Sequence, residues 1–94
     1  DVSEGTKSLH IGGGIVGVCA AQLVKLRGGE AVVLEKSPDR IAFLRQALPD
    51  VPCWSVDDPK LDEKLNAFAP DGVDILQDTV GHAATTDRLV PHVR

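Results

Sequence analysis

The residues best placed to do chemistry are Gly12, Gly14 and Gly17, which form a Gly-x-Gly-x-x-Gly pattern, and Glu35, eighteen positions further on. In this pattern the first glycine permits a tight turn and the second lets an anionic pyrophosphate approach the backbone. The third lets a helix pack closely on a strand. N–H groups at the helix start would face the phosphates, and the Glu35 carboxylate would accept hydrogen bonds from ribose hydroxyls. These residues therefore predict binding of a dinucleotide.

The segments around the glycines have the character that this binding requires. Residues 6–11 are predicted to form a strand, residues 15–27 a helix, and residues 31–34 a buried strand that ends at the acidic residue. The simpler alternative is a glycine-rich loop that closes an ordinary strand–helix unit. The complete strand–turn–helix–strand–acid arrangement favours the dinucleotide site over that alternative.

The rest of the chain continues the same alternation. Ser37, Pro38 and Asp39 open a helix that ends before Pro49, and strands are predicted at 51–56 and from 73 to 76 or 78. Further helices are predicted at 59–68 and 84–92. The fold class is therefore α/β: a Rossmann-type parallel sheet of order 3-2-1-4 with flanking helices, in which strand four is an exposed edge.

Composition limits the classes of protein to consider. With 94 residues and a formal net charge of -4, the chain is at most one domain and has no basic footprint for nucleic acid or an anionic membrane. No apolar run has the length of a membrane span. Cys19 and Cys53 lack CxxC spacing and are predicted to be reduced residues in or near the core, which indicates a cytoplasmic location. Because the chain lacks Met and begins at Asp1, we expect a segment, 1–94, of a larger protein.

Four stretches carry a family resemblance: residues 11–17 (IGGGIVG), 20–28 (AAQLVKLRG), 37–41 (SPDRI) and 71–81 (DGVDILQDTVG). With them the chain resembles the nucleotide-binding domain of the medium-chain dehydrogenase/reductase superfamily, which contains the alcohol dehydrogenases and quinone reductases. The resemblance covers nearly the whole chain but only about the first two thirds of the family's cofactor domain. It implies transfer of hydride between a nicotinamide cofactor and an alcohol, aldehyde, ketone or activated alkene.

The resemblance also implies roles for particular residues. The three glycines and the backbone of two neighbours would hold the pyrophosphate, Glu35 would bind the ribose, and a basic residue would lie near the adenosine. The loop after strand three would flank the adenine, and the turn after strand four would pass beside the cofactor. The expected cofactor-binding residues are Gly12, Gly14, Ile15, Val16, Gly17, Glu35, Lys36, Arg40, Asp57, Thr79, Val80 and Gly81.

In this family the catalytic zinc ligands and the substrate pocket lie mainly in a separate, preceding domain. We therefore assign no catalytic residue and no metal ligand here, and we expect the partner to be the missing catalytic domain of the same parent chain. The isolated segment should be inactive. Glu35 favours NAD over NADP because its carboxylate would repel a 2′-phosphate, although Lys36 and Arg40 are cations that can bind such a phosphate.

Two other functions fit part of the pattern. The stretch 11–17 together with 32–36 is also similar to the start of an FAD-dependent oxidase, but the further glycine- and arginine- or serine-rich loop of those enzymes is absent. A non-catalytic nucleotide-sensing module would have the same fold, because fold does not determine function. Two histidines are interpreted structurally: His10 as a packed sheet residue and His82 as a loop residue beside strand four.

Overall fold

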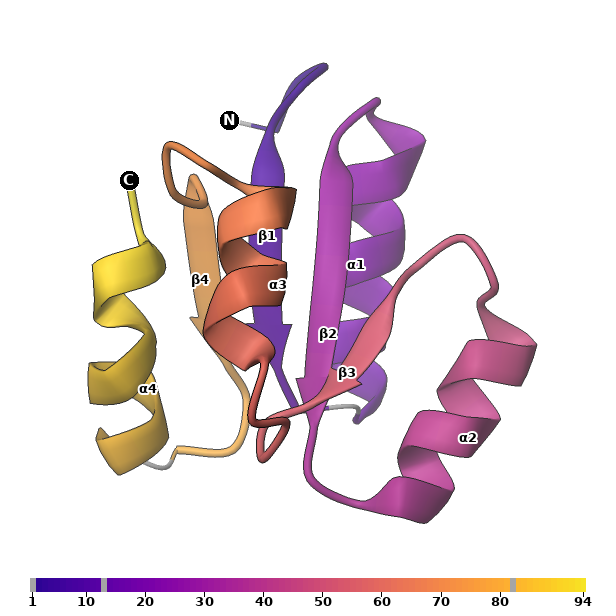
Figure 1. Cartoon of the computed structure of the whole chain (residues 1–94). Coiled ribbons are helices and arrows are strands. Elements are labelled where there is room, and N and C mark those ends of the chain that lie inside the picture. The colour runs from indigo at the N-terminus through magenta and orange to yellow at the C-terminus, as the bar shows by residue number, and fades with distance from the viewer. Residues whose placement is uncertain (1, 13, 82) are drawn as a thin grey trace.

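The chain folds into a parallel sheet with helices on both faces. The computed structural model describes residues 2–12, 14–81 and 83–94, so the predictions for Gly13 and His82 lie outside the described residues. Within the described part, the strands lie in the order β3-β2-β1-β4, as predicted (Figure 1). The elements are β1 (Lys7–Ile11), α1 (Ile15–Leu26), β2 (Glu30–Glu35), α2 (Pro38–Ala47), β3 (Cys53–Ser55), α3 (Leu61–Phe68), β4 (Ile75–Asp78), α4 (Ala83–Leu89) and the 3₁₀ helix η1 (Val90–His92).

Both faces of the sheet are buried, which explains the uninterrupted apolar run in β2. Alternate strand residues contribute to two separate clusters. Leu9 and Leu34 pack with α3 residues such as Leu65, whereas Val33 packs with Val24 of α1 on the opposite face. Figure 1 shows the same layering, with α3 in front of the sheet and α1 behind it. None of the described helices is long and apolar enough to cross a membrane.

The leucines of α1 do not form its buried face. Cys19 is exposed, and Leu23 and Leu26 are 55% and 82% exposed, so the prediction of a core or near-core Cys19 is wrong. Gly17, Ala21 and Val24 face the sheet instead. The reason is steric, because a Cβ on Gly17 would lie 2.5 Å from the carbonyl oxygen of Gly12. Small side chains let the helix approach the sheet closely, and the larger leucines are left on the outside.

Several element boundaries also shift. β4 begins at Ile75 rather than at Val73, because Val73 forms an isolated parallel bridge with Val93. β4 is an edge strand, as predicted, and its residues are half-buried. The helix predicted at 84–92 is α-helical only to Leu89 and continues as η1, which contains Pro91, a residue without a backbone N–H. By contrast, Ser37 caps α2 as predicted, since its side chain accepts a hydrogen bond from the Arg40 N–H.

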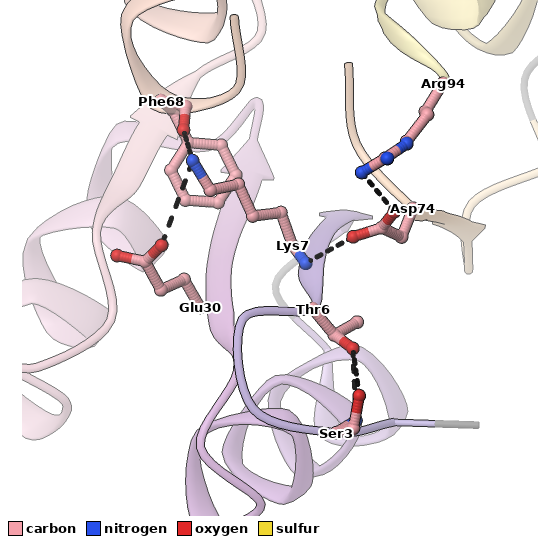
Figure 2. A network of polar contacts seen from close by, with 7 residues as sticks. All are labelled: Ser3, Thr6, Lys7, Glu30, Phe68, Asp74 and Arg94. Atoms are coloured by element: carbon pink, nitrogen blue, oxygen red, sulfur yellow. Dashed lines mark hydrogen bonds and ion pairs between the residues drawn. The ribbon is translucent and has the colours of Figure 1, made fainter. Parts of the chain in front are cut away.

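Side chains close the edge of the sheet where the strands begin. The Lys7 ammonium donates to the carbonyl oxygen of Phe68 at 2.6 Å and lies 3.9 Å from the Glu30 carboxylate (Figure 2). A cation at this place is favourable because Phe68 is the last residue of α3, where the helix dipole is negative. Asp74 accepts a hydrogen bond from the Lys7 N–H and another from the Arg94 guanidinium. These groups are thus satisfied by the chain itself.

Candidate functional site

The glycine turn follows β1 directly. Gly12 has a φ of +103°, and its N–H donates to the Leu34 carbonyl oxygen at 2.7 Å. A side chain on Gly12 would overlap the Thr79 hydroxyl and lie 2.7 Å from a methyl of Val80. Together with the contact between Gly17 and Gly12, this packing leaves no room for a side chain at the first and third glycines. Their predicted roles in the turn and in helix packing agree with this geometry.

The middle glycine has different surroundings. Gly14 is the N-cap of α1, and a Cβ built on it would meet nothing within 4 Å. No side chain among the described residues caps this helix, and its first turn carries no acidic residue. The first N–H groups of a helix have no partner within the helix. The start of α1, whose backbone includes Ile15 and Val16, is therefore open and electropositive, which suits an anion.

A fixed carboxylate lies at the end of the neighbouring strand. Glu35 is 7% exposed, and its Oε2 accepts hydrogen bonds from the N–H groups of Lys36 and Ser37, at 2.7 and 2.8 Å. Its Oε1 lies 3.8 Å from a guanidinium nitrogen of Arg40, whose side chain is 63% exposed. The backbone bonds hold the carboxylate in one orientation, and the exposed arginine is a movable cation beside it.

These groups border one cleft of about 340 Å³ at the carboxyl ends of the strands. That volume lies within the range usual for ligand sites, about 300–1,000 Å³. The lining residues are Ile11, Gly12, Gly14, Leu34, Glu35, Lys36, Arg40, Val56, Asp57, Thr79, Val80 and Thr85. Eight of the expected residues are thus brought together: Gly12, Gly14, Glu35, Lys36, Arg40, Asp57, Thr79 and Val80.

Of the expected residues whose side chains the structure describes, three do not line the cleft; the side chain of Ile15 lies outside the described part. Gly17 is buried behind the glycine turn, whereas Val16 and Gly81 are exposed outside the cleft. Thr85, at the start of α4, lines the cleft and was missed by the sequence analysis. A residue in the first turn of a helix that follows a strand's carboxyl end would have been a usable signal, because ligands bind at that edge of α/β sheets.

The turn after β4 is held by Asp78, which the sequence analysis also missed. Asp78 Oδ1 accepts hydrogen bonds from the N–H groups of Val80 and Gly81, and Oδ2 accepts one from the Thr86 hydroxyl. The next residue, Thr79, donates to the Ile11 carbonyl oxygen through its N–H and its hydroxyl, at 3.0 and 2.8 Å. An aspartate just before a short turn is a recognisable signal for such local hydrogen bonding.

Two further polar residues have structural roles, and one of them, His10, was predicted as such. Asp58 Oδ1 accepts a hydrogen bond from the Lys60 N–H just before α3, and the hydrogen bond from the Lys64 ammonium holds the pKa of the Asp58 carboxyl below its ordinary value. His10 is 2% exposed, with Nδ1 2.7 Å from Gln77 Oε1 and Nε2 2.8 Å from Ser8 Oγ. Burial lowers the pKa of His10.

Comparison with known proteins places this geometry in a fold family. No protein-family profile and no curated protein matches the sequence. Solved structures do match: an Escherichia coli oxidoreductase/dehydrogenase of unknown specificity involved in membrane biogenesis is 27% identical, with a TM-score of 0.79 over 99% of this chain and 27% of that one. Alcohol dehydrogenase TADH from Thermus sp. ATN1 is 23% identical, with a TM-score of 0.80 over 98% of this chain and 27% of that one.

A third match is the Escherichia coli quinone oxidoreductase complexed with NADPH, 19% identical, with a TM-score of 0.77 over 100% of this chain and 29% of that one. The chain thus spans little more than a quarter of the length of these proteins. The predicted resemblance is confirmed as a structural match: the chain has the fold of a portion of these oxidoreductases.

Proposed function

We propose that residues 1–94 form a dinucleotide-binding domain that holds NAD(P) by its pyrophosphate and its adenosine ribose. One observation carries the proposal: the open space at Gly14, at the uncapped start of α1, shares a cleft with the fixed carboxylate of Glu35. An anion and a ribose diol are the groups that such a pair of features would bind.

The remaining residues have supporting roles in this proposal. The backbone from Gly14 to Gly17 donates to the pyrophosphate, and Gly12 shapes the turn. Arg40, in the first turn of α2, and Asp57, in the loop after β3, flank the adenosine, and the turn from Thr79 to Gly81 passes beside the cofactor. The open space at Gly14 is the feature that fits a bound pyrophosphate, because no side chain separates the amides from it.

We further propose that NADH is preferred over NADPH. The support is electrostatic, because a 2′-phosphate would approach the Glu35 carboxylate, which backbone hydrogen bonds hold in place. Lys36 and Arg40 partly offset this repulsion. The quinone oxidoreductase neighbour was solved with NADPH, so the preference proposed for this chain rests on Glu35 alone.

The parent protein, in this proposal, is a cytoplasmic oxidoreductase that transfers hydride between the nicotinamide and an alcohol, aldehyde, ketone or activated alkene. The three oxidoreductases compared above are three to four times as long as this chain. The domain supplies binding and orientation, and the bound cofactor supplies the hydride chemistry. The catalytic groups belong to the rest of the parent, so the 94-residue chain alone should turn over neither an alcohol nor an enone.

Calorimetric titration with NADH, NADPH and FAD tests the proposal. We expect NADH to bind most tightly, and Glu35→Gln to raise the Kd for NADH about tenfold while reducing the discrimination against NADPH. Glu63→Gln, which removes the same charge from an exposed position on α3, is the matched control and should bind as the wild type does. Tighter binding of FAD would indicate a flavoprotein, tighter binding of NADPH would refute the role of Glu35, and absence of all binding would refute the site.

A further inference from the structure

We propose that Asp78 is a positioning residue of the dinucleotide site. Its carboxylate fixes the conformation of the turn after β4, and residues of that turn pack against the glycine turn. The inference rests on the proposed function and goes beyond it, because Asp78 itself does not line the cleft. The residues that line it from this side are Thr79, Val80 and Thr85.

The first step is the set of hydrogen bonds that Asp78 accepts. Oδ1 binds the N–H groups of Val80 at 2.8 Å and Gly81 at 2.9 Å, and Oδ2 binds the Thr86 hydroxyl at 2.5 Å. One carboxylate thus ties the backbone of the turn to Thr86 in α4. Bonds to an ionised acceptor are about twice as strong as neutral ones, so the turn has a defined shape before any ligand arrives.

The second step connects this turn to the glycines. Thr79 donates twice to the Ile11 carbonyl oxygen, immediately before Gly12, and Thr79 and Val80 occupy the space that a Gly12 side chain would need. Asp78 also pairs with Ile11 in the register between β4 and β1. A shift of the turn after β4 would therefore move the residues that set the path of the glycine turn.

The third step concerns charge. The Asp78 carboxylate already engages the N–H groups of Val80 and Gly81, and it places a negative charge where a phosphate would otherwise meet those amides. The start of α1, by contrast, has no capping side chain among the described residues. Asp78 thus directs the pyrophosphate toward α1, and it also fixes the turn after β4, which lines the cleft through Thr79 and Val80.

The experiment combines calorimetric titration of NADH with amide hydrogen exchange on the ligand-free 94-residue chain. Asp78→Asn should raise the Kd about tenfold and Thr86→Val about threefold, because each weakens the hold on the turn. Thr86→Ser keeps the hydroxyl and should restore the wild-type Kd. Asp87→Asn removes the same charge from an exposed position on α4 and controls for the change in net charge.

Exchange of the Val80 and Gly81 amides should become faster in Asp78→Asn, while exchange in β2 stays unchanged. If these two amides exchange faster but the Kd for NADH equals that of Asp87→Asn, the positioning proposal is refuted although the proposed function stands. The same conclusion follows if Thr86→Ser binds as weakly as Thr86→Val. A wild-type chain that binds no dinucleotide would refute the proposed function itself, and the positioning role with it.

Discussion

The edge of the sheet where the strands begin and the edge where they end lie at opposite ends of the same strands in Figure 1. Charged side chains bond to the backbone at both edges, but in the part of the chain that the structure describes only the second edge keeps backbone amides open to a ligand. At the edge where the strands begin, Lys7 and Asp74 bond to backbone groups of their own chain (Figure 2). At the edge where the strands end, Glu35 and Asp78 also bond to backbone amides, yet the amides at the start of α1 have no side-chain partner among the described residues.

The glycines show the same contrast. At the first edge, Gly72 has a φ of +91°, and a Cβ on it would lie 2.7 Å from the Arg94 nitrogen. At the second edge, Gly14 has open space around it. Gly5, at the first edge, has open space as well, but its N–H donates to the Gly28 carbonyl oxygen. Glycine by itself therefore does not mark a ligand site in this fold. What distinguishes the site is a glycine that packs against nothing, next to polar backbone that nothing in the described chain satisfies.

The largest effect is expected from Gly12→Ala, which places a methyl group against Thr79 and Val80 at a positive φ. We expect a loss of about 3 kcal/mol in the free energy of unfolding, measured with urea. Gly5→Ala is the control, because Gly5 has a φ of +86° and nothing within 4 Å of a built Cβ. It should lose only about 1 kcal/mol. Equal losses would contradict the packing described for the glycine turn.

Lys7→Met tests the other edge. The ammonium no longer caps α3, and the Phe68 carbonyl loses a charged donor, so we expect about 1.5 kcal/mol of lost stability and an unchanged Kd for NADH. The matched control is Lys25→Met, at an exposed position near the end of α1, which should lose less free energy of unfolding. A Kd that rises in Lys7→Met but not in Lys25→Met would mean that the two edges are not independent.

Gly14→Ala should weaken binding of NADH and leave the stability of the fold nearly unchanged, the reverse of Lys7→Met. The φ of −77° suits alanine and the new Cβ meets no protein atom, so the free energy of unfolding should change by less than about 1 kcal/mol. The methyl group occupies the space proposed for the pyrophosphate, and the Kd for NADH should rise about tenfold. Unchanged affinity in this variant would place the ligand elsewhere.

The smallest effect is a pH dependence from His10. Because burial lowers its pKa in the folded chain, the unfolded chain takes up a proton below the ordinary value of 6.5 and the folded chain does not. Stability is therefore complete above that value and declines as the pH falls toward the folded pKa. Urea midpoints between about pH 8 and about pH 5 should decline less in His10→Gln than in the wild type.

Local signals in the sequence were enough to predict the strand order and most of the cleft. Three signals can be read from short stretches of sequence: the Gly12–Gly14–Gly17 spacing, the apolar run of β2 and the Ser37 cap of α2. The right-handed connection between parallel strands then leaves few possible orders. Glu35 could be placed beside the glycines because parallel strands end at the same edge.

The parts that were missed depend on contacts that form only in the folded chain. The inward face of α1 is decided by the distance between Gly17 and Gly12, and hydrophobic spacing carries no information on that distance. The bond from Thr86 to Asp78 and the bridge between Val73 and Val93 need the folded chain to exist. Among these, only Asp78 had a local signal, the short turn that follows it.

The central claim is that the two edges differ in their ability to bind a dinucleotide, and a map of amide chemical shifts during titration with NADH tests it most directly. We predict the largest shifts at Gly14, Gly17 and Glu35, with the amides of Lys7 and Asp74 unmoved. Largest shifts at Lys7 and Asp74, or no shifts anywhere at saturating NADH, would contradict the account.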